Sequence, residues 1–200
     1  EKNVEELKEI ASQILKSTGH EEISLSSLSS SDYSKLGDLV ENLIENCHKT
    51  GVNLSLPSLR IDAFSLDVMS KVQDIKKSSL TFAPEAGTQR MRNVINKGLT
   101  KENILDGATK AFLGGWKKVK LYFMLGLPTE TEEDMKGIAE LANEIAATYY
   151  DVLPKEIRGG RVQITSSTSF FIPKPFTPFQ WAPMYTEQDF IHKAKVVKEE

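Results

Sequence analysis

The strongest constraint on the fold is a junction between a strand pattern and a helix pattern. An apolar run over 121–125 stops at Gly126-Leu127-Pro128, and the acidic segment 130–134 follows at once. Thr129 or Thr131 can cap a helix that begins there, because the first turn of a helix has free N–H groups and a positive dipole end that favour carboxylates. This pattern predicts a βα turn of the kind that lines the mouth of an α/β barrel.

The same alternation of strand and helix patterns recurs along the chain. The expected helices are 3–16, 36–44, 65–72, 89–95, 101–113 and 132–149, and the expected strands are 22–28, 52–57, 79–83, 118–125 and 161–166. Strands that are each followed by a helix require right-handed crossovers, so we expect an α/β fold with a mainly parallel sheet. Ligands then bind at the carboxyl ends of the strands, in a closed barrel and in an open sheet alike.

Composition narrows the class of protein. The 200 residues are 40% hydrophobic with a net charge of -3, which suits one globular domain and argues against sequence-independent binding of duplex nucleic acid. We expect no membrane segment and no signal peptide, and hence a cytoplasmic protein. The single Cys47 is expected to be a buried structural thiol at the end of an amphipathic helix. With the scattered His20, His48 and His192, it predicts no metal site within this chain.

Polar side chains follow each expected strand. The five strand ends carry the segments 27–32, 57–62, 84–88, 126–129 and 166–171. Together they offer hydroxyls, Arg60, Glu85 and the aromatic pair Phe170 and Phe171, which suits a ligand with hydroxyls, a carboxylate and a flat ring. Each group also has an ordinary structural interpretation, as a helix cap, a surface carboxylate, an ion pair or a core side chain, and both interpretations stay open here.

Five motifs in a fixed order carry a family resemblance. They occupy 24–33 (SLSSLSSSDY), 56–60 (LPSLR), 83–92 (APEAGTQRMR), 123–131 (FMLGLPTET) and 171–181 (FIPKPFTPFQW). The chain from Glu1 to Trp181 resembles the radical S-adenosylmethionine (SAM) superfamily, and more narrowly the group whose radical SAM domain follows a cobalamin-binding-like domain. The resemblance implies a partial TIM-like (β/α) barrel over 1–200. It also implies an enzyme that binds SAM beside a [4Fe-4S] cluster and generates a 5′-deoxyadenosyl radical.

The sequence departs from the family in one respect. The family holds its cluster with three cysteines in a CxxxCxxC loop after the first strand, and this chain has only Cys47. We therefore expect a fragment that lacks the first strand and the cluster loop and is inactive alone. Other domains of the same polypeptide would supply the cluster ligands and, if it is bound, cobalamin. A barrel without its first strand exposes an edge through which copies can associate.

The resemblance assigns eight positions to SAM and leaves the catalytic residues and the substrate unassigned. They are Ser29 and Ser31 for the amino group, Glu85 for the ribose hydroxyls, Arg60 and Lys97 for the methionine carboxylate, and Gly126, Phe171 and Ile172 for the adenine. A carboxylate can accept hydrogen bonds from both ribose hydroxyls, and an arginine can bind a carboxylate with two parallel bonds.

The segment 173–181, rich in proline and aromatic residues, predicts a stiff extended strap. It forms either a lid across the barrel mouth or a crossover packed under the last helix.

Two other functional classes remain. A partner- or RNA-binding module would use the strap with Lys117, Lys118 and Lys120, although these lysines also suit a solvated strand start. A non-radical barrel lyase or hydrolase would use Glu85 with Asp32 and Asp62.

Overall fold

The structure is a computed structural model that describes residues 2–25, 33–55 and 80–200. The first part of the chain forms α1 (Val4–Thr18), β1 (Glu22–Ser24), α2 (Leu36–Thr50) and β2 (Asn53–Ser55). The remainder forms β3 (Leu80–Glu85), α4 (Gln89–Val94), α5 (Lys101–Leu113), β4 (Lys118–Leu125), α6 (Glu132–Val152), β5 (Gln163–Phe170) and α7 (Glu187–Glu199). The predicted helix over 65–72 lies outside the described residues.

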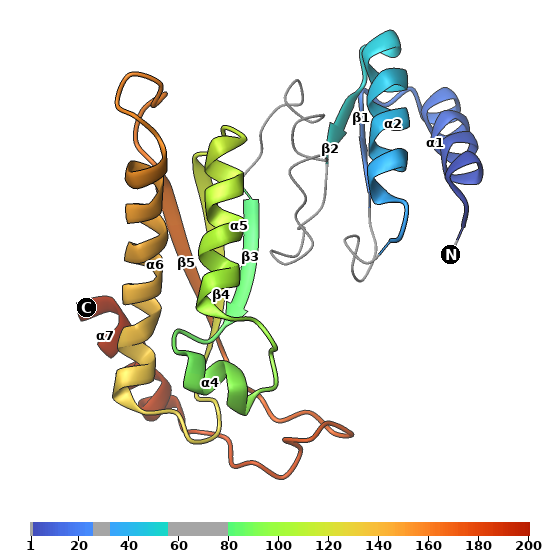
Figure 1. Ribbon diagram of the computed structural model, residues 1–200. Helices are drawn as coiled ribbons and strands as arrows, with labels where there is room; N and C mark the ends of the chain where they lie inside the picture. The colour runs from blue at the N-terminus through green and yellow to red at the C-terminus, as the bar shows by residue number, and fades with distance from the viewer. Residues whose placement is uncertain (1, 26–32, 56–79) are drawn as a thin grey trace.

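The strands pair in parallel throughout the described part of the chain. β1 pairs with β2, and β3, β4 and β5 form a second sheet in that order, with helices between successive strands (Figure 1). The carboxyl ends of β3, β4 and β5 therefore meet at one edge, which we call the rim. This arrangement confirms the predicted α/β fold with a parallel sheet, and the sheet is partial.

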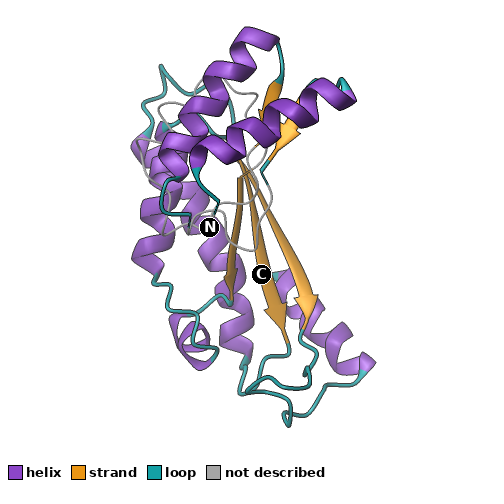
Figure 2. Cartoon of the chain, turned by 90° about the vertical axis from the view of Figure 1, so that its right-hand side faces the viewer, coloured by secondary structure: helices purple, strands orange, loops and turns teal. Residues whose placement is uncertain are grey.

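The core lies between the larger sheet and its helices. Val119, Leu121, Phe123 and Leu125 alternate along β4 and are at most 1% exposed, packed in one cluster with side chains of α5 and α6. Figure 2 shows these helices on one side of the strands. Each large apolar side chain buried in this way contributes about 1.5–3 kcal/mol. The intervening residues of β4 point to the opposite, inner face of the sheet, because side chains alternate along a strand.

Side-chain caps begin α5 and α6 at the residues where the sequence predicts these two helices to start. Thr131, one of the two candidate caps, accepts a hydrogen bond from the backbone N–H of Asp134, whose side chain in turn accepts from the Thr131 backbone. Thr100 and Asn103 form the same reciprocal cap at α5. Such caps contribute about 1 kcal/mol each and fix the residue at which a helix starts. They explain why α5 and α6 begin where the sequence indicates.

β5 differs from its prediction. The sequence indicated a strand over 161–166 followed by a polar turn, whereas β5 runs from Gln163 to Phe170 in unbroken register with β4. The physical reason is that β4 supplies backbone partners along the whole segment, so its serines and threonines continue the strand instead of forming a turn. The expected placement of 166–170 after the strand end was wrong, and the rim here begins at Phe171.

Cys47 is buried on α2, with 5% of its surface exposed among Ala11, Leu39, Leu43 and Leu54. Burial raises the pKa of its thiol, which keeps it protonated and unreactive at neutral pH. The prediction of a buried structural cysteine is confirmed. In the described ranges, no helix combines the length and the apolar character that crossing a bilayer requires.

Candidate functional site

Glu85 and Lys97, two of the residues predicted for the site, meet at the rim. Glu85 is the last residue of β3, and the Nζ of Lys97, which follows α4, lies 3.3 Å from its carboxylate oxygen. Their side chains are 27% and 32% exposed. An ion pair this accessible to solvent contributes about 0–1 kcal/mol, so a ligand can separate the two charges at little cost. A carboxylate and an ammonium are thus available side by side to one ligand.

Gly126 directly follows β4 in a backbone conformation that disfavours residues with a side chain. Its φ is +84°, and a Cβ atom there would lie 2.8 Å from Cε1 of Phe190 and 3.1 Å from Cδ2 of Tyr185. Its backbone N–H donates to Oε2 of Glu130 over 2.8 Å. Phe190 of α7 and Tyr185, which precedes the Thr186 cap of α7, therefore pack against Gly126. Their contact fixes the backbone of the rim at this position.

Phe171 continues β5 and is 9% exposed. Its N–H donates to the carbonyl of Leu125 over 2.8 Å, and its ring packs with Ala86, Met91 and Leu127. Ile172, the next residue, is 59% exposed. Phe171 therefore belongs to the packed layer beneath the rim, and Ile172 is the exposed residue of this segment.

The proline-rich strap is packed along one side and open along the other. Phe179 lies edge-on to Phe171, with ring centroids 5.9 Å apart, and joins the layer beneath the rim. The amide of Gln180 donates to the carbonyl of Thr177, which tightens the segment. Phe176 and Trp181 are 98% and 88% exposed. The strap thus combines a packed crossover with an exposed aromatic surface, and the partner-binding alternative stays a prediction.

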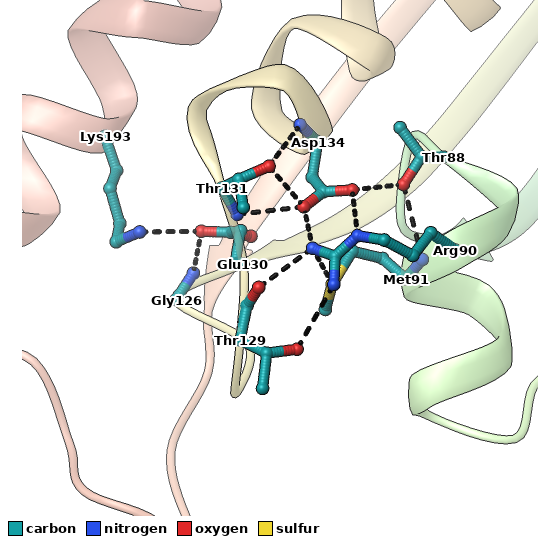
Figure 3. A network of polar contacts seen from close by, with 9 residues as sticks. All are labelled: Thr88, Arg90, Met91, Gly126, Thr129, Glu130, Thr131, Asp134 and Lys193. Carbon is teal, nitrogen blue, oxygen red and sulfur yellow. Dashed lines mark hydrogen bonds and ion pairs between the residues drawn. The ribbon is translucent and has the colours of Figure 1, made fainter.

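A polar network ties the loops after β3 and β4 together (Figure 3). Asp134 is 4% exposed and accepts hydrogen bonds from Thr88, Arg90 and Thr131. Arg90 also donates to the carbonyl of Thr129 over 2.8 Å. The sequence indicated only the capping role of Asp134, because its partner Arg90 lies 44 residues away in the chain. The network fixes the distance between the ends of β3 and β4.

Burial alone would raise the pKa of Asp134, but the hydrogen bonds from Arg90, Thr88 and Thr131 outweigh it and hold the pKa well below its usual value of 3.8. A carboxylate with a lowered pKa stabilises the fold above its unfolded pKa, and this contribution is lost as the pH falls below about 4. The network is therefore weakened by acid.

We expect Asp134→Asn to reduce the free energy of unfolding by about 2–3 kcal/mol at pH 7, because it removes charged hydrogen bonds from a buried site. The difference from the wild type should shrink as the pH falls through 4. Urea titrations between pH 3 and 7 measure both effects. Glu133→Gln, which changes an exposed carboxylate in the same helical turn, is the control and should stay within about 0.5 kcal/mol. Equal stability of Asp134→Asn and wild type at pH 7 would contradict this interpretation.

A second, more buried ion pair joins the rim to α7. The side chains of Glu130 and Lys193 are 3% and 9% exposed, and Nζ of Lys193 lies 2.9 Å from Oε2 of Glu130. The same ammonium lies 4.4 Å from the centroid of the Tyr185 ring. Oε2 of Glu130 therefore receives Lys193 from one side and the N–H of Gly126 from the other, as Figure 3 shows. The sequence alone does not indicate this pair, because Glu130 and Lys193 are 63 residues apart in the chain.

Left-handed backbone conformations gather near the rim. Four non-glycine residues have positive φ, namely Glu85 (68°), Asn96 (53°), Thr129 (65°) and Phe176 (64°), among the residues that the structure describes. They belong to β3, the α4–α5 connection, the β4–α6 loop and the strap. Such conformations cost about 1–2 kcal/mol each outside glycine and cluster at functional sites. Of the other predicted site residues, Ser29, Ser31 and Arg60 lie outside the described part of the chain.

A family model of the radical SAM superfamily matches residues 1–142. The chain belongs to the radical SAM superfamily. It is also 38% identical over 141 residues to the uncharacterized protein MJ0966 of Methanocaldococcus jannaschii, a match covering 69% of this chain and 28% of that protein. The crystal structure of HydG, a maturase of the [FeFe]-hydrogenase, matches with a TM-score of 0.54 at 16% identity, over 99% of this chain and 43% of that one.

These findings confirm the predicted superfamily and its TIM-barrel-like fold. The radical SAM chain spans less than half of either matched protein. Membership implies an enzyme that uses SAM and a [4Fe-4S] cluster, but the residues present do not fit the cluster. Cys47 is the only cysteine of the sequence and is buried on α2. No three His, Cys, Asp or Glu side chains of the described segments are grouped to hold a metal. The cobalamin-binding-like domain stays a prediction.

Proposed function

We propose that this chain is the SAM-binding part of a cytoplasmic radical SAM enzyme and holds SAM at the rim formed by β3, β4 and β5. The observation that carries the proposal is the pair of opposite charges at Glu85 and Lys97, on the same rim as the close-packed Gly126 that follows β4. SAM carries ribose hydroxyls, a methionine carboxylate and an adenine. The rim offers an acceptor for the first, a cation for the second and, next to the buried Gly126 and Phe171, the exposed Ile172 for the third.

In this proposal the residues have distinct roles. The Glu85 carboxylate accepts hydrogen bonds from the ribose hydroxyls, and the Lys97 ammonium binds the methionine carboxylate. Gly126 and the backbone of Phe171 and Ile172 meet the adenine. Ser29, Ser31 and Arg60 are proposed for the amino and carboxylate groups of the methionine part, as the family resemblance implies.

We do not propose that this chain holds the [4Fe-4S] cluster. In this proposal the cluster ligands are residues outside these 200, within the same polypeptide, because one cysteine cannot supply three thiolates. Bound beside such a cluster, SAM supplies a 5′-deoxyadenosyl radical. The residues described here bind and orient SAM. Cobalamin binding would belong to another domain, and it remains a proposal from family resemblance alone.

Binding of SAM to the full-length natural protein tests this proposal. We expect Glu85→Ala to weaken SAM binding about 10- to 100-fold, because hydrogen bonds to a charged acceptor contribute about 1.5–3 kcal/mol. Equilibrium dialysis with labelled SAM measures the affinity. Glu140→Gln, a change of an exposed carboxylate on α6, should bind SAM as the wild type does. Either no binding by the wild type or equal affinity of wild type and Glu85→Ala would refute the assignment.

A further inference from the structure

The inner face of the larger sheet, opposite its helices, is polar. Because Val119 to Leu125 bury every second side chain against α5 and α6, Lys118, Lys120, Tyr122 and Met124 point to the inner face. Their register partners on β5 include Thr165, Ser167 and Ser169, and Thr81 of β3 pairs with Lys120. The inner face of this sheet thus carries lysines on β4 and hydroxyl side chains on β3 and β5.

Lys120 is the third of the eight residues of β4, the middle strand of this sheet, and lies toward the amino end of the inner face. Its side chain is half-buried, and its Nζ lies 4.8 Å from the centroid of the Tyr122 ring. Its register partners on the two neighbouring strands, each about 4.8 Å away, are Thr81 of β3 and Thr165 of β5. Among the described residues, no carboxylate lies within ion-pair distance of Lys120.

The charge of this face is unbalanced. β4 and β5 contain no acidic residue, and the one acid of β3, Glu85, is paired with Lys97 at the rim. Lys118, on the same face, adds a second positive charge. A lysine with a threonine at the register position on each side, and with no ion-paired carboxylate among the described residues, suits an oxyanion, because phosphate and carboxylate groups accept several charge-assisted hydrogen bonds.

We propose that Lys120, Thr81 and Thr165 form a subsite for an oxyanion of the substrate, a phosphate or a carboxylate, with the Tyr122 ring holding the ammonium in place. This proposal rests on SAM binding at the rim. Lys120 precedes Gly126 by six residues. At about 3.3 Å per residue, the subsite lies about 20 Å along the strand from the rim. The substrate is therefore an extended molecule whose anionic end is at Lys120 while its reacting end faces SAM.

The lysine could instead be an ordinary solvated residue at the start of a strand, and Lys118 provides the comparison. Lys118 is exposed and lies on the same strand and face as Lys120. Among the described contacts, no aromatic ring lies against the ammonium of Lys118. If charge alone attracted anions to this face, Lys118 and Lys120 would contribute equally. A built subsite requires that Lys120 contribute much more.

Calorimetric titration of the full-length protein with sodium phosphate and, separately, sodium acetate tests the subsite, with sodium chloride at equal ionic strength as the reference. We expect saturable binding of phosphate or acetate that weakens at least 10-fold in Lys120→Gln. Lys120→Arg, which keeps the charge, and Lys118→Gln should each stay within 3-fold of the wild type. The phosphate and acetate arms show which oxyanion the subsite prefers.

Measurement of SAM affinity on the same variants separates the two proposals. Lys120→Gln should bind SAM with wild-type affinity, which also shows that it is folded. Equal anion binding by wild type, Lys120→Gln and Lys118→Gln would overturn the subsite, as would an absence of saturable binding in both arms. Failure of the wild type to bind SAM would instead overturn the proposed function, whatever the anion titrations give.

Discussion

Replacing Lys193 by methionine is expected to cost about 3–5 kcal/mol of the free energy of unfolding. Methionine fills a similar volume but leaves the carboxylate of Glu130, whose side chain is 3% exposed, without its charged partner. Attraction between the two charges offsets the cost of removing them from water, and removal of one charge leaves that cost uncompensated. Urea denaturation followed by circular dichroism measures the change.

Two further variants show whether the ion pair is responsible. Lys195→Met changes an exposed lysine of the same helix and should alter stability by less than about 0.5 kcal/mol. The double variant Glu130→Gln with Lys193→Met removes both charges and should recover much of the loss, since no buried charge remains unpaired. A loss below about 1 kcal/mol in Lys193→Met, or a double variant no better than the single one, would show that the pair is not important for stability.

Gly87→Ala is expected to have the second large effect, a loss of about 3 kcal/mol or more. A Cβ at Gly87 would lie 2.8 Å from the carbonyl oxygen of Gly137 and under 3.0 Å from the backbone nitrogen of Ile138, both in α6. Backbone atoms of a helix cannot rotate away as a side chain can. The loop after β3 or the start of α6 must therefore move, which also separates Thr88 from Asp134.

The facing glycine gives the matched comparison. A Cβ at Gly137 would meet a side-chain atom, the Cγ2 of Thr88, at 2.7 Å. Gly137→Ala combined with Thr88→Ser removes this methyl group and keeps the hydroxyl. Because alanine favours a helix over glycine by about 1 kcal/mol, we expect this double variant to be as stable as the wild type or more so. Thermal unfolding of the two variants measures the difference, and equal losses would contradict the proposed backbone contact.

The sequence was most informative where structure depends on near neighbours. α5 and β4 have the predicted bounds, because a threonine cap marks the start of α5 and alternation of apolar residues marks β4. β5 was predicted too short because its serines and threonines resemble a turn until a neighbouring strand is present. Local pattern therefore specifies the elements, and strand pairing decides where a polar strand ends.

In the candidate site, too, the sequence indicated individual residues but not the contacts between distant parts of the chain. Family resemblance assigned Glu85 and Lys97 to different parts of one ligand, and the structure joins them in an ion pair. The two networks that support the rim could not be predicted, since Arg90 and Asp134 are 44 residues apart and Glu130 and Lys193 are 63 apart. No local periodicity encodes such pairs. They result from the packing of α4 and α7 against the loops after the strands.

The left-handed residues of the rim have a consequence for how the sequence can evolve. Glycine adopts these angles without the steric penalty, so replacing Glu85 by glycine would relax the backbone while removing the carboxylate proposed to bind the ribose. Mutation and selection for folding alone would favour that exchange. A lineage that keeps an acid at this strained position therefore retains it against a thermodynamic advantage, which only a selected activity can sustain.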